Sequence, residues 1–150
     1  MDPTFTMLAR VAAATGQRLT IEATQSIRRE SLATVAAETL GGDPEDTPWT
    51  QLRGLIDWLR VHPDVASDAI ADPPLRTTPH LDNLLAAIAN KVADDQGSQR
   101  PSWTSDVPIP ADPWQAPGTP RMRACERATA PRQFIERNIH LAEANLWRSK

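Results

Sequence analysis

Histidine and cysteine, the side chains that most often carry catalytic or metal chemistry, are few and widely spaced in this chain. His62, His80 and His140 are far apart in sequence, and none stands four residues from another histidine or close to the single Cys125. Because a zinc site would need three separate segments to converge, we predict no metal site. We expect His62 to cap the C-terminus of a helix, His80 to stand at a helix start and His140 to donate from a loop.

Cys125 is the only candidate nucleophile of this kind. Arg121, Arg123 and Arg127 surround it, and their charges could favour the thiolate. The chain offers no histidine nearby as a base and no second cysteine to resolve a disulfide. We therefore interpret Cys125 as a structural or incidental thiol.

Two pairs of adjacent acids, Glu45–Asp46 and Asp94–Asp95, are the candidates for acid–base catalysis. Catalysis needs one member of such a pair to be buried with a shifted pKa, and neither pair has apolar neighbours. The chain also lacks a glycine-rich phosphate loop and the Gly-x-Ser-x-Gly and His-Glu-x-x-His motifs. We predict no catalytic residue and no cofactor, so a small enzyme of unknown class is the third-ranked interpretation.

Charge is distributed unevenly along the chain, whose net charge is −3. Residues 38–118 carry five basic and thirteen acidic residues, whereas residues 119–150 carry seven basic and three acidic ones. Solvated faces and a terminal helix with paired charges would explain this pattern. Alternatively, the acidic middle could dock on a basic partner, such as an enzyme with a cleft for nucleotides, and the terminal arginines could grip phosphate.

Proline and tryptophan mark residues 98–130. Seven prolines between Pro101 and Pro131 exclude long helices there, while Trp103 and Trp114 are large side chains that favour burial. We predict an extended arm that is pinned either to the body of the protein or along a partner.

The elements that must position these residues are mainly helices. Apolar spacing predicts amphipathic helices over residues 26–40, 49–61, 63–71 and 79–96, the last of which stops at Gly97. Shorter helical turns are expected at 121–128, after Pro131 and at 142–148. The sequence thus predicts a mainly α fold, a small helical bundle followed by the proline- and tryptophan-rich arm.

The first residues predict a different unit, a helix followed by a short strand. Phe5, Leu8 and Val11 share one helical face, Gly16 suits the turn after the helix, and residues 18–23 alternate in polarity as a strand does. The edge of this strand could pair with a second copy in a homodimer.

This opening string resembles the last part of an Xre/Cro-type helix-turn-helix domain. The residues that carry the resemblance are Asp2-Pro3-Thr4, Leu8, Arg10, Ala14, Gly16 and Leu19. The resemblance implies that the helix pair which enters the DNA major groove is not encoded here, which argues against sequence-specific DNA binding by this chain alone.

A second resemblance covers residues 80–146. This stretch is similar to the C-terminal part of actinobacterial helix-turn-helix proteins whose genes often lie beside a nucleotidyltransferase-like toxin gene. The residues that carry the resemblance are the run 84–89, Pro101-Ser102-Trp103, Pro113-Trp114, Phe134 and Arg137-Asn138. The chain departs from them at Ile139-His140, where an aromatic residue is usual. The resemblance implies an antitoxin or antitoxin-like regulator.

We therefore expect a cytoplasmic antitoxin-like protein with two parts, a helical domain (1–97) and the arm with its terminal helices (98–150). It would neutralise a toxin enzyme by binding it, with the helices in 49–96 and the arm as surfaces. A DNA-binding regulator is the alternative. No run of the chain is apolar enough to span a membrane. The expected partner contacts are Trp103, Trp114, Phe134, Arg137 and Asn138.

Overall fold

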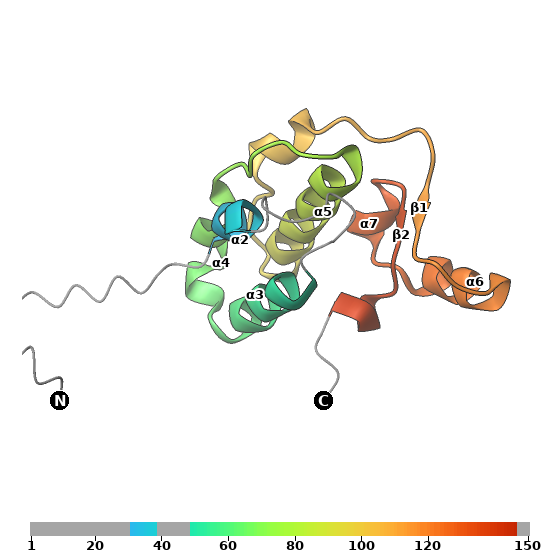
Figure 1. Cartoon of the computed structure of the whole chain (residues 1–150). Helices are drawn as coiled ribbons and strands as arrows, with labels where there is room; N and C mark the ends of the chain where they lie inside the picture. The colour runs from blue at the N-terminus through green and yellow to red at the C-terminus, as the bar shows by residue number, and fades with distance from the viewer. Residues whose placement is uncertain (1–30, 39–48, 147–150) are drawn as a thin grey trace, which may run out of the picture.

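The computed structural model describes residues 31–38 and 49–146 of the chain. Figure 1 shows a mainly helical body, which confirms the predicted mainly α class. The α-helices are α2 (Leu32–Glu38), α3 (Trp49–Val61), α4 (Pro63–Ala71), α5 (Pro79–Asp95), α6 (Pro120–Thr129) and α7 (Arg132–Ile135). Between and after them come two 3-10 helices, η1 (Ser102–Asp106) and η2 (Glu143–Leu146), and two short strands, β1 (Trp114–Gln115) and β2 (Ile139–His140).

Helix α5 is the centre of the fold. All eleven residues from Asn83 to Ala93 are buried, so the helix is surrounded on every side rather than on one stripe. Its start is fixed by Thr78, whose hydroxyl accepts the Leu81 N–H at 3.2 Å, and by Pro79 in the first position. It ends at Gly97, as predicted, where a φ of 64° suits glycine and the next N–H returns to Ala93 O.

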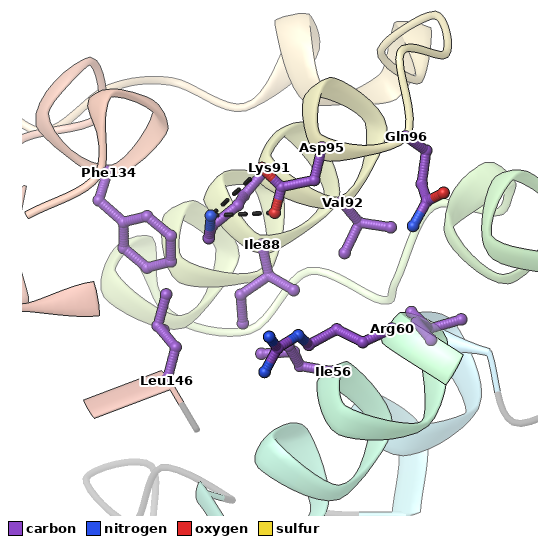
Figure 2. A pocket seen from close by; sticks show the side chains of 10 residues that line it. Ile56, Arg60, Ile88, Lys91, Val92, Asp95, Gln96, Phe134 and Leu146 are labelled. Carbon is purple, nitrogen blue, oxygen red and sulfur yellow. Dashed lines mark hydrogen bonds and ion pairs between the residues drawn. The ribbon is translucent and has the colours of Figure 1, made fainter. Parts of the chain in front are cut away.

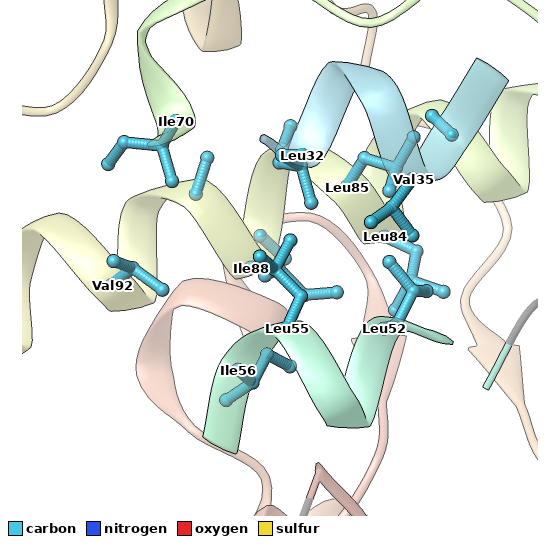
Figure 3. Close-up of a cluster of buried hydrophobic side chains, with 14 of the residues drawn as sticks. Leu32, Val35, Leu52, Leu55, Ile56, Ile70, Leu84, Leu85, Ile88 and Val92 are labelled. Carbon is cyan, nitrogen blue, oxygen red and sulfur yellow. The ribbon is translucent and has the colours of Figure 1, made fainter. Parts of the chain in front are cut away.

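The helices α2, α3 and α4 cover one side of α5. Figure 3 shows Leu32 and Val35 of α2 and Leu52 and Leu55 of α3 gathered against Leu84, Leu85 and Ile88 of α5. The bounds predicted for 49–61 and 63–71 coincide with α3 and α4. Because their apolar residues recur at helical spacing, the sequence alone was enough to locate them.

The C-terminal residues close the other side of α5. Phe134 of α7, Ile139 of β2 and Leu146 of η2 are each no more than 1% exposed and belong to the same apolar cluster as the helices. The two strands form a parallel pair in which Trp114 stands opposite Ile139. This pair was not predicted, because two residues are too few to show an alternating pattern.

The extended arm predicted for residues 98–130 is not supported. This segment forms η1, β1 and the ten-residue helix α6, and it contributes Trp103 and Val107 to the core. The prolines stand at first helical positions and in the connections between elements, so none interrupts a helix. The predicted terminal helix at 142–148 is the 3-10 helix η2 within the described residues.

Three predictions concern residues outside the described ranges. The first is the N-terminal helix and strand, together with the homodimer that the strand edge would allow. The second is the part of the 26–40 helix before Leu32 and after Glu38, and the third is the acid pair Glu45–Asp46.

Candidate functional site

Three of the five residues expected to contact a partner lie inside the molecule. Trp103 is 9%, Phe134 0% and Arg137 6% exposed, while Trp114 and Asn138 are half-buried. Trp103 bonds to the end of α4, Arg137 bonds to Asn83 of α5, and Phe134 belongs to the core cluster that includes α5. Of the two arrangements that the sequence left open for the tryptophans, the structure has the intramolecular one.

Trp103 attaches η1 to the end of α4. Its indole Nε1–H donates to Ile70 O at 2.9 Å, in a buried hydrogen bond. Ile70 is the penultimate residue of α4, and the last carbonyl groups of a helix have no partner within it. Trp103 therefore satisfies a helix end while its ring fills the core.

Arg137 joins α5, η1 and the turn after α7. One terminal nitrogen donates to Asn83 Oδ1 at 3.1 Å and the other donates to Thr104 O. Its Nε is buried without a partner, and Arg137 takes part in none of the ion pairs among the described residues. Burial lowers the pKa of this guanidinium.

Asn83 and Asn138 extend this junction to the proline-rich connection. Asn83 Nδ2 donates to Pro79 O at 2.8 Å and to Pro108 O at 2.9 Å, and Asn138 Nδ2 donates to Pro110 O at 2.6 Å. Asn138 has a positive φ of 56°, a conformation that asparagine tolerates better than most residues.

His80 is packed against Trp114 rather than positioned for chemistry. The two rings are stacked with centroids 4.3 Å apart, and both ring nitrogens are buried without a hydrogen-bond partner. Burial lowers the pKa of His80, which favours a neutral ring. As expected, His80 stands at a helix start, as the second residue of α5.

The other two histidines are also accounted for by local contacts. His62 Nδ1 bonds to Trp58 O at 2.9 Å, which confirms its role at the end of α3. His140 lies in β2 rather than in a loop, and Gln115 Nε2 bonds to its Nδ1 at 2.8 Å, so the expectation of a loop donor was wrong. Within residues 31–38 and 49–146, no three metal-ligating side chains come together.

The acids Asp94 and Asp95 form separate surface ion pairs instead of a catalytic pair. Arg100 binds Asp94 through two hydrogen bonds and lowers the pKa of that carboxyl to about 2. Asp95 pairs with Lys91 at 3.0 Å, and Lys91 also reaches Glu143 of η2 at 3.0 Å. These contacts fasten the C-terminal elements to α5.

Helix α6 is the most unusual surface element. None of its ten residues is buried, and Figure 1 shows it beside the strands, on the opposite side of the molecule from α4. Glu126, its only acid, faces the body, where the Ala142 N–H and Asn145 Nδ2 donate to the two carboxylate oxygens. Arg121, Arg123 and Arg127 are exposed and form no ion pair with any described residue. Paired charges, one explanation for the basic terminal segment, are found for Arg132 and Glu136 but not for the three α6 arginines within the described residues, which form a solvated face.

An apolar pocket lies between α3, α5 and the C-terminal elements. Figure 2 shows Ile56, Ile88, Phe134 and Leu146 around it, with the Lys91–Asp95 ion pair at its edge. Only about 30 Å³ is open to the centres of water molecules, which is room for one or two of them. The pocket is too small for an organic ligand without movement of its walls.

Two polar residues of this geometry, Asn83 and Arg100, were not among the residues that the sequence pointed to, and neither was the buried Asn90 of α5. The two asparagines are seven residues apart inside an apolar helical run. A polar residue among apolar ones on the side of a helix that packs against the core was the signal that could have identified them, because buried amides usually form hydrogen bonds. Arg100 gave no such signal.

Comparison of the chain with known protein families, with curated proteins and with solved structures gives no match. Among the described residues, no helix is both long and apolar enough to cross a membrane.

Proposed function

We propose that this protein is antitoxin-like and neutralises a toxin enzyme by stoichiometric binding. The observation that carries the proposal is α6, a helix that is fixed to the body through Glu126 yet buries none of its own residues. A helix gains most of its stability from packing an apolar face. One that packs no such face but is held in place is well suited to present side chains to a partner.

Two features of the α6 arginines support this role, because they oppose the stability of the helix, although Arg127 in the last turn is favourably placed for the helix dipole. Arg121 lies in the first turn, close to the positive end of the helix dipole, and that turn contains no acid to offset it. Arg123 and Arg127 are four residues apart, so their like charges repel each other. An arrangement that carries these costs and gains no ion pair with a described residue is expected where the arginines serve binding.

The partner we infer has an acidic cleft that faces α6, in place of the basic partner that the acidic residues 38–118 suggested. Nucleotidyl transfer commonly relies on Mg²⁺, which proteins hold through carboxylates. Arginines placed against such carboxylates would form bidentate pairs and occupy the positions of the metal and the nucleotide. The resemblance of residues 80–146 to antitoxins of nucleotidyltransferase-like toxins agrees with this class of partner.

A second candidate function, nucleic-acid binding by a regulator, is favoured by the same unpaired arginines. Arg132, at the start of α7, adds a fourth side chain that is 82% exposed and, among the described residues, pairs with Glu136. Such a cluster can contact phosphates without reading sequence. The acidic remainder of the chain works against this candidate, because it repels a long polyanion.

The deciding experiment is co-expression of the full chain with each adjacent gene product, followed by co-purification and a growth test. We expect a stable complex with a toxic neighbour and rescue of growth. The triple variant Arg121→Gln, Arg123→Gln, Arg127→Gln should weaken that complex at least about 100-fold, since interface arginines paired with carboxylates each contribute more than tenfold.

The matched control is Thr50→Glu, Gln51→Glu, Ser67→Glu, which changes the net charge by the same −3 at exposed positions of α3 and α4. This control should leave the complex intact. Equal weakening by both triples would show that overall charge, or the surface expected on the helices of residues 49–96, governs binding and not α6 alone. No complex with any neighbour, together with a gel shift of duplex DNA that the arginine triple abolishes, would replace the antitoxin proposal with the nucleic-acid one.

A further inference from the structure

Helix α4 carries a row of exposed acids. Asp64, Asp68 and Asp72 follow one another at intervals of four residues, so they lie on one side of the helix and its C-cap. Asp64 and Asp72 form no ion pair with any described residue, and the nine residues of α4 include no base. We call these three acids the aspartate row.

The aspartate row matches α6 in charge and in length. The arginine face of α6 consists of Arg121, Arg123 and Arg127, which span six residues or about 9 Å of helix. The outer acids of the row are eight residues apart, which corresponds to about 12 Å. An arginine side chain is long enough to cover the difference, so both ends of the row can be paired at once.

One molecule cannot bring these two surfaces together. Figure 1 shows α6 beside the strands and α4 on the opposite side of α5, and Glu126 fastens α6 to the residues after β2. An ion pair between the arginine face and the aspartate row therefore requires a second copy of the chain. Because each copy would use a different surface, the contact is head to tail and does not stop at a dimer.

Apolar side chains accompany both charged surfaces. Met122 is exposed on α6 between two of the arginines, and Val61 and Leu75 are exposed three residues before and after the aspartate row. Protein–protein contacts commonly combine an apolar centre with a polar or charged rim. The two surfaces thus offer both kinds of contact to each other.

We infer that this protein self-associates head to tail, with the arginine face of one copy on the aspartate row of the next. The inference goes beyond the proposed function, because the two surfaces meet without any toxin. It adds a means of control to that function. An arginine face that lies on a neighbouring copy is covered, so a toxin has to compete with that copy for α6.

The test is sedimentation velocity of the full chain over a range of concentrations, at low and at high salt. We expect species that grow beyond a dimer with concentration at low salt and that dissociate at high salt, because surface ion pairs are screened. A species whose size depends on neither concentration nor salt would overturn the inference. A fixed dimer counts as such a species, since the strand predicted for residues 18–23 would explain it.

Charge reversal identifies the two surfaces. The variants Arg123→Glu with Arg127→Glu and Asp64→Arg with Asp72→Arg should each weaken self-association at least about tenfold, because like charges then face each other. A mixture of the two variants should associate again, since both possible contacts between them pair opposite charges. Self-association that either variant retains alone, or that the mixture does not regain, would contradict the inference.

Neutral variants give the same test without reversed charges, in case a reversal prevents folding. We expect Arg123→Gln with Arg127→Gln, and Asp64→Asn with Asp72→Asn, each to weaken self-association. The matched control for the aspartate row is Asp106→Asn with Asp112→Asn, which changes the charge equally at exposed positions outside α4. Equal weakening by this control would show that overall charge is responsible and would overturn the inference.

The asparagine pair in the aspartate row also separates this inference from the proposed function. It leaves every arginine of α6 in place, so it should lose self-association and keep the toxin complex in the co-expression experiment. If the chain binds no toxin, sedimentation still decides whether it self-associates.

Discussion

Replacement of Trp103 tests whether the proline-rich segment belongs to the core. The indole is 9% exposed and packs in the same apolar cluster as Phe134 and the helices. Trp103→Ala removes this ring and leaves the carbonyl of Ile70, at the end of α4, without its donor at 2.9 Å. Both effects act on the folded state of the isolated protein.

The expected magnitude follows from burial and from the hydrogen bond. A buried tryptophan removes roughly 200 Å² from water, which at about 25 cal/mol per Å² is near 5 kcal/mol, and measured truncations of this kind cost about 3–5 kcal/mol. Trp103→Phe keeps most of the ring but loses the N–H. It should cost about 1–2 kcal/mol, mainly for the unpaired carbonyl.

The assay is unfolding in urea followed by far-ultraviolet circular dichroism, because the chain has five tryptophans and fluorescence would not isolate one. Trp114→Ala is a useful comparison, since that ring is only half-buried and should cost less than Trp103→Ala. If Trp103→Ala left the free energy of unfolding unchanged but abolished partner binding, the burial argument would be refuted and the tryptophan would be a partner contact.

Two further predictions concern the turn after α7 and the surface ion pairs. Asn138→Gly keeps the left-handed turn but loses the bond to Pro110 O, so it should cost about 1 kcal/mol, whereas Asn138→Ala loses both and should cost about 2–3 kcal/mol in the same urea assay. Equal losses would mean that the positive φ carries no penalty. The pKa of Asp94 is lowered to about 2 from an unfolded value of 3.8, so its stabilisation is complete above pH 4 and is lost as the pH falls towards 2. Because the pair is on the surface, we expect only about 1 kcal/mol, and Arg100→Gln should remove most of this acid dependence in thermal melts between pH 2 and 5.

The sequence predicted the helices that have a regular apolar stripe and failed where contacts are distant. The helices over residues 49–61 and 63–71, and the stop of α5 at Gly97, depend on local periodicity and capping. The packing of residues 98–130 depends instead on contacts with distant parts of the chain. Prolines there excluded long helices, which is correct, but their number does not tell whether the chain between them is extended or folded on the body.

The expected partner contacts show the same limit. Trp103 stood out because a large side chain in a proline-rich segment favours burial, and Phe134 and Arg137 because they belong to the resemblance over residues 80–146. Such residues are also common wherever a segment is fastened to a core. Which of the two applies depends on whether Asn83 and Thr104 lie within reach of Arg137, 54 and 33 residues away in sequence. A single sequence carries no signal for a contact at that separation.

The charge that α6 presents to solvent differs from the charge that its composition suggests. From composition, Glu126 offsets one of the three arginines on the helix. In the structure its carboxylate accepts from the Ala142 N–H and from Asn145 Nδ2, so it faces the body and forms no ion pair with them. The outward charge of the helix is therefore more positive than its composition suggests. The hydrogen bonds that hold α6 in place are the same ones that turn its only acid away from its arginines.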